Sequence, residues 1–253
     1  MDTNKRRVLV TGGASGLGAT IVRALANAGH DVTFTYRSSA DGANRLVADL
    51  SASRPQQTFA ARALDLGDKA AIEAFCGEID TANAYSGFVH NAGQSYDSLA
   101  VMMDQAKAEA AMQVNFWSFT RLATKLVRPM MRARDGRVVV IGSVTALQAN
   151  QGNAAYAASK AALLGYVRTL AIEIARTGVT VNYLAPGFID TAMMEPYAKY
   201  REQMENQIPA RRFARPEEIA DVVAFLLSSQ ASYLTGAVLP IDGGLSAAIG
   251  IQR

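Results

Sequence analysis

The chain has 253 residues, 50% of them hydrophobic, which is enough for one large domain with a substantial core. Its formal net charge of +3 does not indicate a nucleic-acid-binding protein. The single cysteine, Cys76, excludes an intramolecular disulfide framework and fits a reducing compartment, and two histidines are too few for a zinc cluster. No apolar run reaches the roughly 18 residues of a membrane span, and Val8–Val10 is too short for the core of a signal peptide. We therefore expect a cytoplasmic protein with one domain over residues 1–253, no membrane segment, no nucleic-acid partner and no metal.

A predicted strand over residues 6–11 is followed by a glycine-rich turn and by a helical pattern over Ala19–Ala28. The turn carries Gly12, Gly16 and Gly18 in the spacing G-x-x-x-G-x-G. Glycines let backbone amides approach a pyrophosphate, and the N-terminus of a helix favours negative charge. A tight turn without a ligand also uses glycine, but the order strand, turn and helix is typical of the first half of a nucleotide-binding βαβ unit.

The end of the second predicted strand, residues 31–36, indicates which dinucleotide binds. A carboxylate at this place would hold the ribose hydroxyls of NAD, whereas a nearby arginine suits the 2′-phosphate of NADP. The segment continues with Arg37 and Ser38 and has no acid before Asp41. A planar cation and a hydroxyl are good phosphate partners, so NADP is favoured. The alternative is that Arg37 is a solvated loop residue.

Strands and helices alternate along the rest of the chain. Helices are expected over residues 40–52, 69–79, 105–134 and 154–177 and from Pro216 onward, and strands over residues 57–63, 86–90, 138–141, 179–184 and 237–241. This alternation predicts a parallel sheet that is covered by helices on both faces.

The long helical region over residues 105–134 contains one polar residue on its apolar face. Asn115 interrupts this face, and a polar residue on a packed face needs hydrogen-bond partners. Four arginines follow toward the end of the region, and cations are favoured at the C-terminus of a helix. These are Arg128, Arg132, Arg134 and Arg137.

An acid–base pair is predicted just after the fifth strand. Ser143 follows the apolar run Val138–Ile141, and Tyr156 and Lys160 lie four residues apart, on one face of a helix. The positive charge is expected to lower the pKa of the Tyr156 phenol from its usual value near 10, so that it exchanges a proton near neutral pH. An ordinary surface pair would have the same spacing, and it is the company of Ser143 and Asn115 that favours a catalytic site.

These motifs together resemble the short-chain dehydrogenase/reductase family over residues 8–244. The motifs are the glycine-rich turn, Asn91-Ala92-Gly93, Asn115, Ser143, Tyr156-x-x-x-Lys160 and Pro186-Gly187. The resemblance implies an α/β fold, a single-domain Rossmann-like, doubly wound, parallel seven-stranded sheet with the strand order 3-2-1-4-5-6-7. It also implies hydride transfer to a carbonyl.

The family resemblance assigns a role to each catalytic residue. Ser143 would stabilise the carbonyl oxygen, and Tyr156 would donate the proton. Lys160 would lower the pKa of the Tyr156 phenol and hold the nicotinamide ribose. Asn115 would hold a local helix irregularity and support the proton relay.

The resemblance also implies which residues contact NADP. They are Gly12, Ser15, Gly16, Leu17, Gly18, Arg37, Ser38, Asp65, Leu66, Asn91, Ala92, Gly93, Tyr156, Lys160, Pro186, Gly187, Ile189 and Thr191. Asp65 would contact the adenine, although a turn residue that caps the next helix would look the same. Asn91 would steady the central sheet, and Ile189 and Thr191 would contact the carboxamide. His90 is interpreted as structural.

Within the family, the chain is similar to 3-oxoacyl-(acyl-carrier-protein) reductases through Ala185–Thr191, Ile208–Arg211 and Pro216–Ala220. This similarity implies an acyl thioester substrate, an acidic acyl-carrier protein as partner and a homotetramer.

The carrier protein would contact Arg134 and Arg176 in a basic patch beside the substrate entrance, although Arg176 sits one residue before the matching position, Thr177. Residues 188–213 are expected to form a mobile lid, and residues 245–253 to pack against a neighbouring subunit.

Two other functions stay open from the sequence. One is a dehydrogenase for a small alcohol, sugar or steroid, because such enzymes share many of these stretches. The other is a cofactor-binding regulator without turnover, although such proteins usually lose the catalytic Tyr or Lys, and both are present here.

Overall fold

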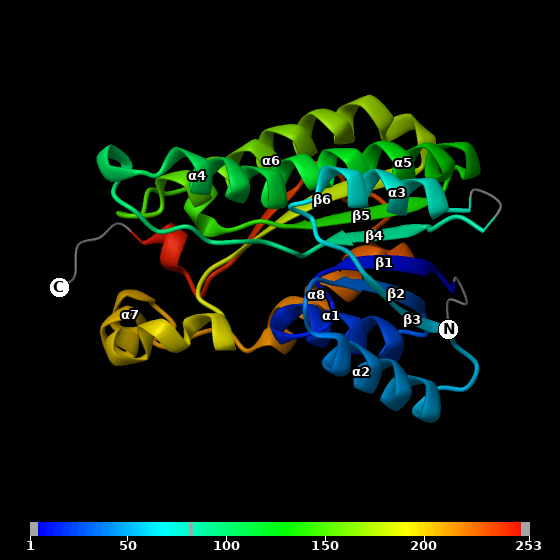
Figure 1. Cartoon of the computed structure of the whole chain (residues 1–253), viewed down its shortest axis with the longest axis horizontal. Helices are drawn as coiled ribbons and strands as arrows, with labels where there is room; N and C mark the ends of the chain where they lie inside the picture. The colour runs from blue at the N-terminus through cyan, green and yellow to red at the C-terminus, as the bar shows by residue number, and fades with distance from the viewer. Residues whose placement is uncertain (1–4, 81–82, 249–253) are drawn as a thin grey trace.

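A seven-stranded parallel sheet forms the centre of the computed structural model, which describes residues 5–80 and 83–248 (Figure 1). Its strand order, β3-β2-β1-β4-β5-β6-β7, confirms the predicted topology, and every neighbouring pair is parallel. The strands are β1 (Arg7–Thr11), β2 (Asp31–Tyr36), β3 (Phe59–Ala63), β4 (Gly87–His90), β5 (Gly136–Ile141), β6 (Val179–Pro186) and β7 (Val238–Ile241).

Helices cover both faces of the sheet, as predicted. Figure 1 shows α3, α4, α5 and α6 on one side and α1, α2 and α8 on the other. The α-helices are α1 (Gly16–Asn27), α2 (Ala40–Ser53), α3 (Lys69–Glu78), α4 (Gln105–Met112), α5 (Ser118–Ala133), α6 (Ala154–Ile174), α7 (Arg201–Gln207) and α8 (Pro216–Leu227). Short 3₁₀ segments are η1 (Ala100–Met102), η3 (Val144–Ala146), η4 (Ala175–Thr177), η5 (Ala192–Tyr200), η6 (Ser229–Ala231) and η7 (Leu245–Ala247), and η2 (Gln113–Trp117) is a π-helical turn.

Two apolar layers sandwich the sheet, because successive side chains of a strand point to opposite faces. In β5, Val138 and Val140 pack with α3, α5 and α6, whereas Val139 packs with α1 and α8 on the other face. Strands that are buried on both faces read as continuous apolar runs, which is why the sequence reveals β5 so clearly. Within the described ranges, no helix is long and apolar enough to cross a membrane.

The long helical region predicted over residues 105–134 is not one helix. It consists of α4 and α5 joined by the π-helical turn η2, which contains Asn115. The helix predicted over residues 154–177 likewise ends at Ile174 and continues as the 3₁₀ turn η4. The helix irregularity implied at Asn115 is therefore present.

One member of the predicted arginine cluster is buried rather than exposed. Arg137 lies in β5 with 5% exposure and donates to the carbonyl of Ser228 at 3.3 Å. Asp135 lies beside it and forms a bidentate ion pair with Arg6 at 2.7 and 3.0 Å. The exposed cluster thus consists of Arg128, Arg132 and Arg134, because Arg137 belongs to the buried strand β5.

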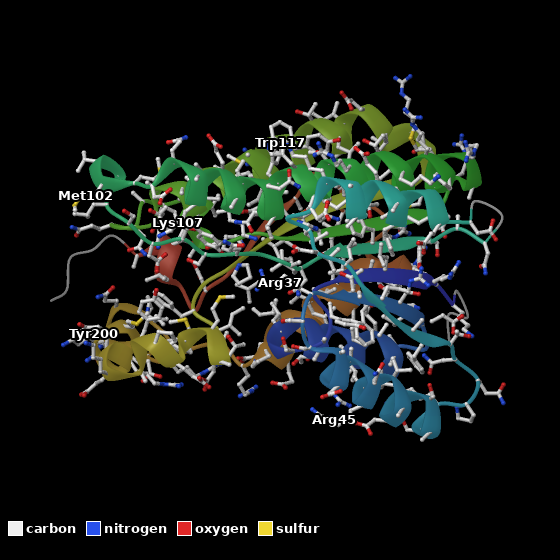
Figure 2. The ribbon with its side chains drawn as sticks, in the orientation of Figure 1. Arg37, Arg45, Met102, Lys107, Trp117 and Tyr200 are labelled. Atoms are coloured by element: carbon white, nitrogen blue, oxygen red, sulfur yellow. The ribbon has the colours of Figure 1, made fainter. Side chains whose placement is uncertain are left out.

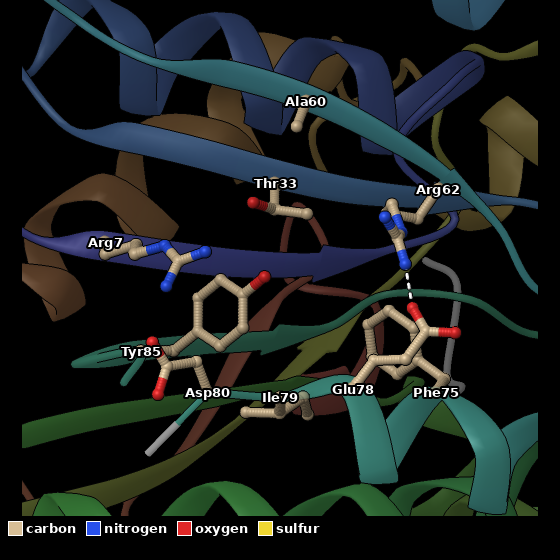
Figure 3. A pocket seen from close by; sticks show the side chains of 9 residues that line it. All are labelled: Arg7, Thr33, Ala60, Arg62, Phe75, Glu78, Ile79, Asp80 and Tyr85. Carbon is tan, nitrogen blue, oxygen red and sulfur yellow. Dashed lines mark hydrogen bonds and ion pairs between the residues drawn. The ribbon is translucent and has the colours of Figure 1, made fainter. Parts of the chain in front are cut away.

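Two hollows lie away from the predicted catalytic residues. A cavity of about 170 Å³ beside the end of α3 is lined by Arg7, Thr33, Ala60, Arg62, Phe75, Glu78, Ile79, Asp80 and Tyr85, and within it Arg62 pairs with Glu78 (Figure 3). A groove of about 470 Å³ between α3 and α5 is lined by Ile72, Glu73, Cys76, Arg121, Thr124, Lys125, Arg128, Pro129 and Arg132. Neither contains a residue of the predicted catalytic set.

Candidate active site

The structure brings the four predicted catalytic residues together at the carboxyl edge of the sheet. Ser143 follows the end of β5, Asn115 comes from the π-helical turn η2, and Tyr156 and Lys160 occupy the first two turns of α6. Ser159 links Asn115 with Tyr156, because it accepts a hydrogen bond from Asn115 Nδ2 at 2.8 Å and donates to the carbonyl of Tyr156 at 2.7 Å.

The Ser143 hydroxyl is oriented by its neighbour Thr145. Its Oγ accepts from the Thr145 backbone N–H at 3.2 Å and from the Thr145 hydroxyl at 2.9 Å. Both acceptor positions of a serine hydroxyl are then in use, so its remaining role is that of a donor, and the Tyr156 hydroxyl is its partner in this structure. Ser143 is therefore prepared to donate to a carbonyl oxygen beside it.

Tyr183 in β6 connects two catalytic residues, and no sequence motif singles it out. Its buried hydroxyl accepts from the Ser143 backbone N–H at 3.1 Å and donates to the Lys160 carbonyl at 3.1 Å. The ring packs against Gly142, where an added Cβ would lie 1.7 Å from the Tyr183 Cζ atom. Only the pairing of β5 with β6, which aligns Val140 with Tyr183, reveals this contact.

The pKa of Tyr156 moves in the direction opposite to the prediction. Burial raises it to about 12, while a hydrogen bond with Ser143 acts to lower it. Lys160 is 2% exposed, and burial lowers its own pKa to about 8. The prediction of a lowered Tyr156 pKa is wrong because burial outweighs the effects that lower it, and Lys160 Nζ donates to the carbonyl of Ile141 at 3.0 Å and lies 5.6 Å from the centre of the Tyr156 ring. Tyr156 therefore keeps its proton at neutral pH and can act as an acid.

Asn115 holds the loop after β4 against α6. Its side chain accepts from the N–H of Gln94 at 2.7 Å and donates to the carbonyl of Gln94 at 3.0 Å. Its own carbonyl lies 3.0 Å from His90 Nε2, and His90 Nδ1 lies 3.2 Å from the Thr11 hydroxyl. Burial lowers the pKa of His90 to about 3, so His90 is a neutral bridge between β1 and η2, which agrees with a structural role.

The first turn of α1 can hold an anion. Its N-cap, Ser15, makes no side-chain cap, and the turn carries no acidic residue, so its N–H groups are available to a phosphate. Gly16 has a φ of +50°, and a Cβ added there would have no heavy atom within 4 Å, whereas a Cβ at Gly18 would lie 1.9 Å from the Gly12 carbonyl oxygen. The glycines are thus required for two reasons, the backbone conformation at Gly16 and the packing of helix on strand at Gly18.

Asn91 fixes the neighbouring strand end. Its side chain donates to the carbonyls of Thr11 and Gly12, both at 3.1 Å, which agrees with the implied role in steadying the sheet. The backbone N–H groups of Asn91 and Ala92 both donate to the Thr11 hydroxyl. Gly93 then comes within reach of Lys160, because a Cβ there would lie 3.2 Å from Lys160 Nζ.

Arg37 and Ser38 are exposed at the end of β2, and Figure 2 shows Arg37 between the two helical layers. In the part of the chain that the structure describes, Arg37 makes no ion pair with a carboxylate. An unpaired cation at this place suits a phosphate.

Asp65 forms a turn, but it does not cap the next helix. Its Oδ1 accepts from the N–H of Gly67 at 2.8 Å, whereas α3 is capped by Asp68, which accepts from Ala70 and Ala71. Leu66, beside it, is buried and its carbonyl accepts from Gln113 at 3.1 Å. The capping alternative for Asp65 is therefore wrong, and its carboxylate stays exposed at the edge of the sheet.

The residues expected at the nicotinamide end follow β6. Pro186 ends the strand, and Gly187 lies against Asp242, where a Cβ would be 2.9 Å from the Asp242 Cβ. Ile189 forms an isolated bridge with Ala214, and Thr191 precedes η5. The expected lid thus leaves the sheet at the catalytic edge and returns beside its own starting point.

The two arginines expected to contact a carrier protein lie at the opposite edge of the sheet. Arg134 is the C-cap residue of α5, just before β5 begins, and donates to the carbonyl of Arg176 in η4 at 3.1 Å, whereas Ser143 lies beyond the other end of β5. A strand of this length spans about 20 Å. The expectation that this patch lies beside the substrate entrance is therefore wrong if that entrance is the one next to Ser143 of the same chain, and the contact of Arg134 and Arg176 with a carrier protein stays a prediction. The packing expected of residues 245–253 concerns in part residues 249–253, which lie outside the described residues.

The chain matches known proteins over nearly its whole length. The family model described as enoyl-(acyl carrier protein) reductase matches residues 12–246. The 3-oxoacyl-(acyl-carrier-protein) reductase MabA of Mycobacterium tuberculosis is 38% identical over 242 residues, which cover 95% of this chain and 92% of that relative. The 3-oxoacyl-(acyl-carrier-protein) reductase FabG of Escherichia coli is 36% identical over 253 residues, which cover 97% of this chain and 99% of that relative.

Solved structures share the fold. A short-chain dehydrogenase/reductase from Serratia marcescens has a TM-score of 0.88 at 32% identity, covering 95% of this chain and 98% of that one. YwfH, an NADPH-dependent reductase involved in bacilysin biosynthesis, has a TM-score of 0.91 at 24% identity, covering 97% of this chain and 100% of that one. At that identity the second likeness shows the fold alone.

Proposed function

Because the chain belongs to the short-chain dehydrogenase/reductase family, we propose that it uses NADPH to reduce a 3-oxoacyl thioester to the 3-hydroxyacyl form. The observation that carries this proposal is the convergence of Ser143, Tyr156 and Lys160 beside Asn115 at the carboxyl edge of the sheet. The relatives named as 3-oxoacyl-(acyl-carrier-protein) reductases support the choice of substrate.

In the proposed reaction Ser143 donates a hydrogen bond to the substrate carbonyl oxygen, since Thr145 already occupies its acceptor positions. Tyr156 gives its proton to the same oxygen as negative charge develops there, because a phenol whose pKa is about 12 is protonated at working pH. A bound nicotinamide nucleotide supplies the hydride. Lys160 stays protonated near Tyr156, and its ammonium group can donate to a ribose.

Arg37 and Ser38 favour NADPH over NADH in this proposal. The 2′-phosphate would lie at the end of β2, where Arg37 offers a guanidinium that pairs with no carboxylate of the described chain. The amides at the start of α1 would hold the pyrophosphate, and Asp65 would contact the adenine.

The description of the matching family model, enoyl-(acyl carrier protein) reductase, supports a second candidate, reduction of a carbon–carbon double bond. One experiment separates the candidates: oxidation of NADPH and of NADH is followed with acetoacetyl thioester, crotonyl thioester, simple ketones and sugars. The proposal requires the fastest turnover with the acetoacetyl thioester and NADPH. Faster turnover with the crotonyl thioester supports the second candidate, and faster turnover with a ketone or sugar supports a dehydrogenase for small alcohols.

An acidic acyl-carrier protein and a homotetramer complete the proposal. Because Arg134 and Arg176 lie at the edge of the sheet away from Ser143, a carrier protein bound there would deliver its acyl group to the site of a neighbouring subunit. The assembly is thus a condition for this docking mode. Light scattering at micromolar concentration measures it directly, and a monomer that retains full activity with the carrier-bound substrate would contradict this docking mode.

A further inference from the structure

The middle of the expected lid has few anchors. In residues 192–207, which comprise η5 and α7, no residue is buried. Arg201 pairs with Asp190 at 2.8 Å and with Glu205 at 2.8 Å, but both partners belong to the lid itself. In the described chain, residues 192–207 form one hydrogen bond with the protein outside the expected lid, residues 188–213. In this bond the Tyr197 hydroxyl donates to Asp97.

Asp97 lies on the loop between β4 and η1 and binds three different partners. Its Oδ2 accepts from the Tyr197 hydroxyl, while its Oδ1 accepts from Ser95 Oγ at 2.8 Å and from Asn153 Nδ2 at 2.6 Å. The hydrogen bond with Asp97 raises the pKa of Tyr197, as expected for a phenol that donates to a carboxylate.

Asn153 links Asp97 to α6, the helix that contains Tyr156. It is the N-cap residue of α6, yet its side chain caps no N–H of the helix and turns to Asp97 instead. The backbone strengthens the junction, because the N–H of Ser98 donates to the carbonyl of Gly152 at 2.7 Å. Tyr156 follows three residues after Asn153, and its pKa is raised mainly by burial and in smaller part by the Asp97 carboxylate. One carboxylate thus contacts both the lid and the start of the helix that carries the proton donor.

We propose that Asp97 is a positioning residue that holds residues 192–207 closed against the start of α6 through Tyr197 and fixes the start of α6 through Asn153. The substrate would bind beside this lid, whose hydrogen bond to the rest of the described chain is exposed, so the lid can open without breaking a buried hydrogen bond. The two halves of the contact have separate consequences. Loss of the hydrogen bond between Tyr197 and Asp97 affects lid closure, whereas loss of the Asp97 side chain also affects the placement of Tyr156.

Tyr197→Phe tests the contact between Asp97 and the lid, because it removes only the donor hydroxyl. We expect KM for the carbonyl substrate to rise by about 5–10-fold while kcat changes less than about 2-fold, since an exposed hydrogen bond to a charged group makes a modest contribution. Cleavage by trypsin after Lys199 and Arg201 should accelerate by a similar factor, because cleavage follows the population of the open lid. Tyr200→Phe is the matched control: Tyr200 lies on the outer side of the lid, where its ring contacts Lys199 (Figure 2).

Asp97→Ala tests the contact between Asp97 and Asn153 as well. It should raise KM and the rate of cleavage as Tyr197→Phe does, and it should also lower kcat, because Asn153 loses its partner. The double variant should be cleaved no faster than Asp97→Ala alone, since both substitutions break the same bond.

The proposal is wrong if Tyr197→Phe leaves both KM and the cleavage rate at wild-type values. It is equally wrong if Tyr200→Phe accelerates cleavage as much as Tyr197→Phe does. The kinetic part rests on the proposed reductase function and uses whichever carbonyl compound the wild-type enzyme reduces. The cleavage part needs no substrate, so a failure of the proposed function and a failure of this proposal give different results.

Discussion

Lys160→Met removes a positive charge from a site that is 2% exposed and replaces it with a side chain of similar length. Burial lowers the pKa of Lys160 from its ordinary value of 10.5 to about 8. Between these two pH values the unfolded chain binds a proton that the folded chain does not bind, so the free energy of unfolding of the wild type rises with pH. Below pH 8 both states hold the proton, and the folded protein carries the whole cost of the buried charge, about 3 kcal/mol.

The assay compares urea unfolding of wild type and Lys160→Met at pH 7 and at pH 10.5. The lost hydrogen bond to the Ile141 carbonyl affects the variant at both pH values and cancels in the comparison. We expect the stability of the variant relative to the wild type to fall by about 3 kcal/mol between pH 7 and pH 10.5. The variant should also lose reductase activity at both values.

Lys69→Met provides the control, because Lys69 is exposed at the start of α3 and its charge stays in water. Its stability relative to the wild type should change little between the two pH values. A constant difference between wild type and Lys160→Met across the same range would refute the reasoning, since it would show that the buried ammonium carries no such cost.

Tyr156→Phe should abolish reduction while cofactor affinity, measured by fluorescence titration, stays nearly unchanged, because only the proton donor is lost; near-normal turnover would exclude the proposed role. Arg37→Asp should shift the ratio of kcat/KM values from NADPH toward NADH, since a carboxylate repels the 2′-phosphate and accepts from ribose hydroxyls; an unchanged ratio would place phosphate recognition elsewhere. Tyr183→Phe should lower kcat and reduce the free energy of unfolding by about 1–3 kcal/mol, because the Ser143 N–H loses a buried acceptor; wild-type kcat would show that Ser143 is positioned by other contacts. Arg134→Glu should raise KM for a carrier-bound 3-oxoacyl substrate and leave a short thioester unaffected, and the carrier-dependent rate should fall with added salt; equal effects on both substrates, or none, would contradict carrier docking there.

The alternation of elements and the short motifs were enough to predict the fold and the residues that gather at the candidate active site. Alternation of apolar strands with amphipathic helices is a local pattern, and it predicts β2 with its observed bounds, residues 31–36. The glycine-rich turn and the spacing of Tyr156 and Lys160 are also local, since a helix places residues four apart on one face whatever surrounds it. Properties that depend on a few neighbouring residues can be predicted in this way.

The electrostatics of the site and its supporting contacts depend on residues that are distant in the sequence. The pKa of Tyr156 rises instead of falling because burial outweighs other effects, and burial depends on residues far away in the chain. Tyr183 reaches Ser143 across 40 residues of sequence, because β5 and β6 pair in register. Tyr197, in the segment after β6, donates to Asp97, in the loop after β4, although the two residues are 100 positions apart in the sequence.

The position of Arg134 shows the same limit. Its spacing in the sequence indicated a basic cluster, but a run of arginines carries no information about which edge of the sheet it occupies. That edge is set by the direction of α5, which ends where β5 begins, at the end of the sheet opposite Ser143. Local sequence therefore predicts which residues belong to the candidate site, whereas the pairing of distant strands sets which side chains meet there and how their pKa values shift.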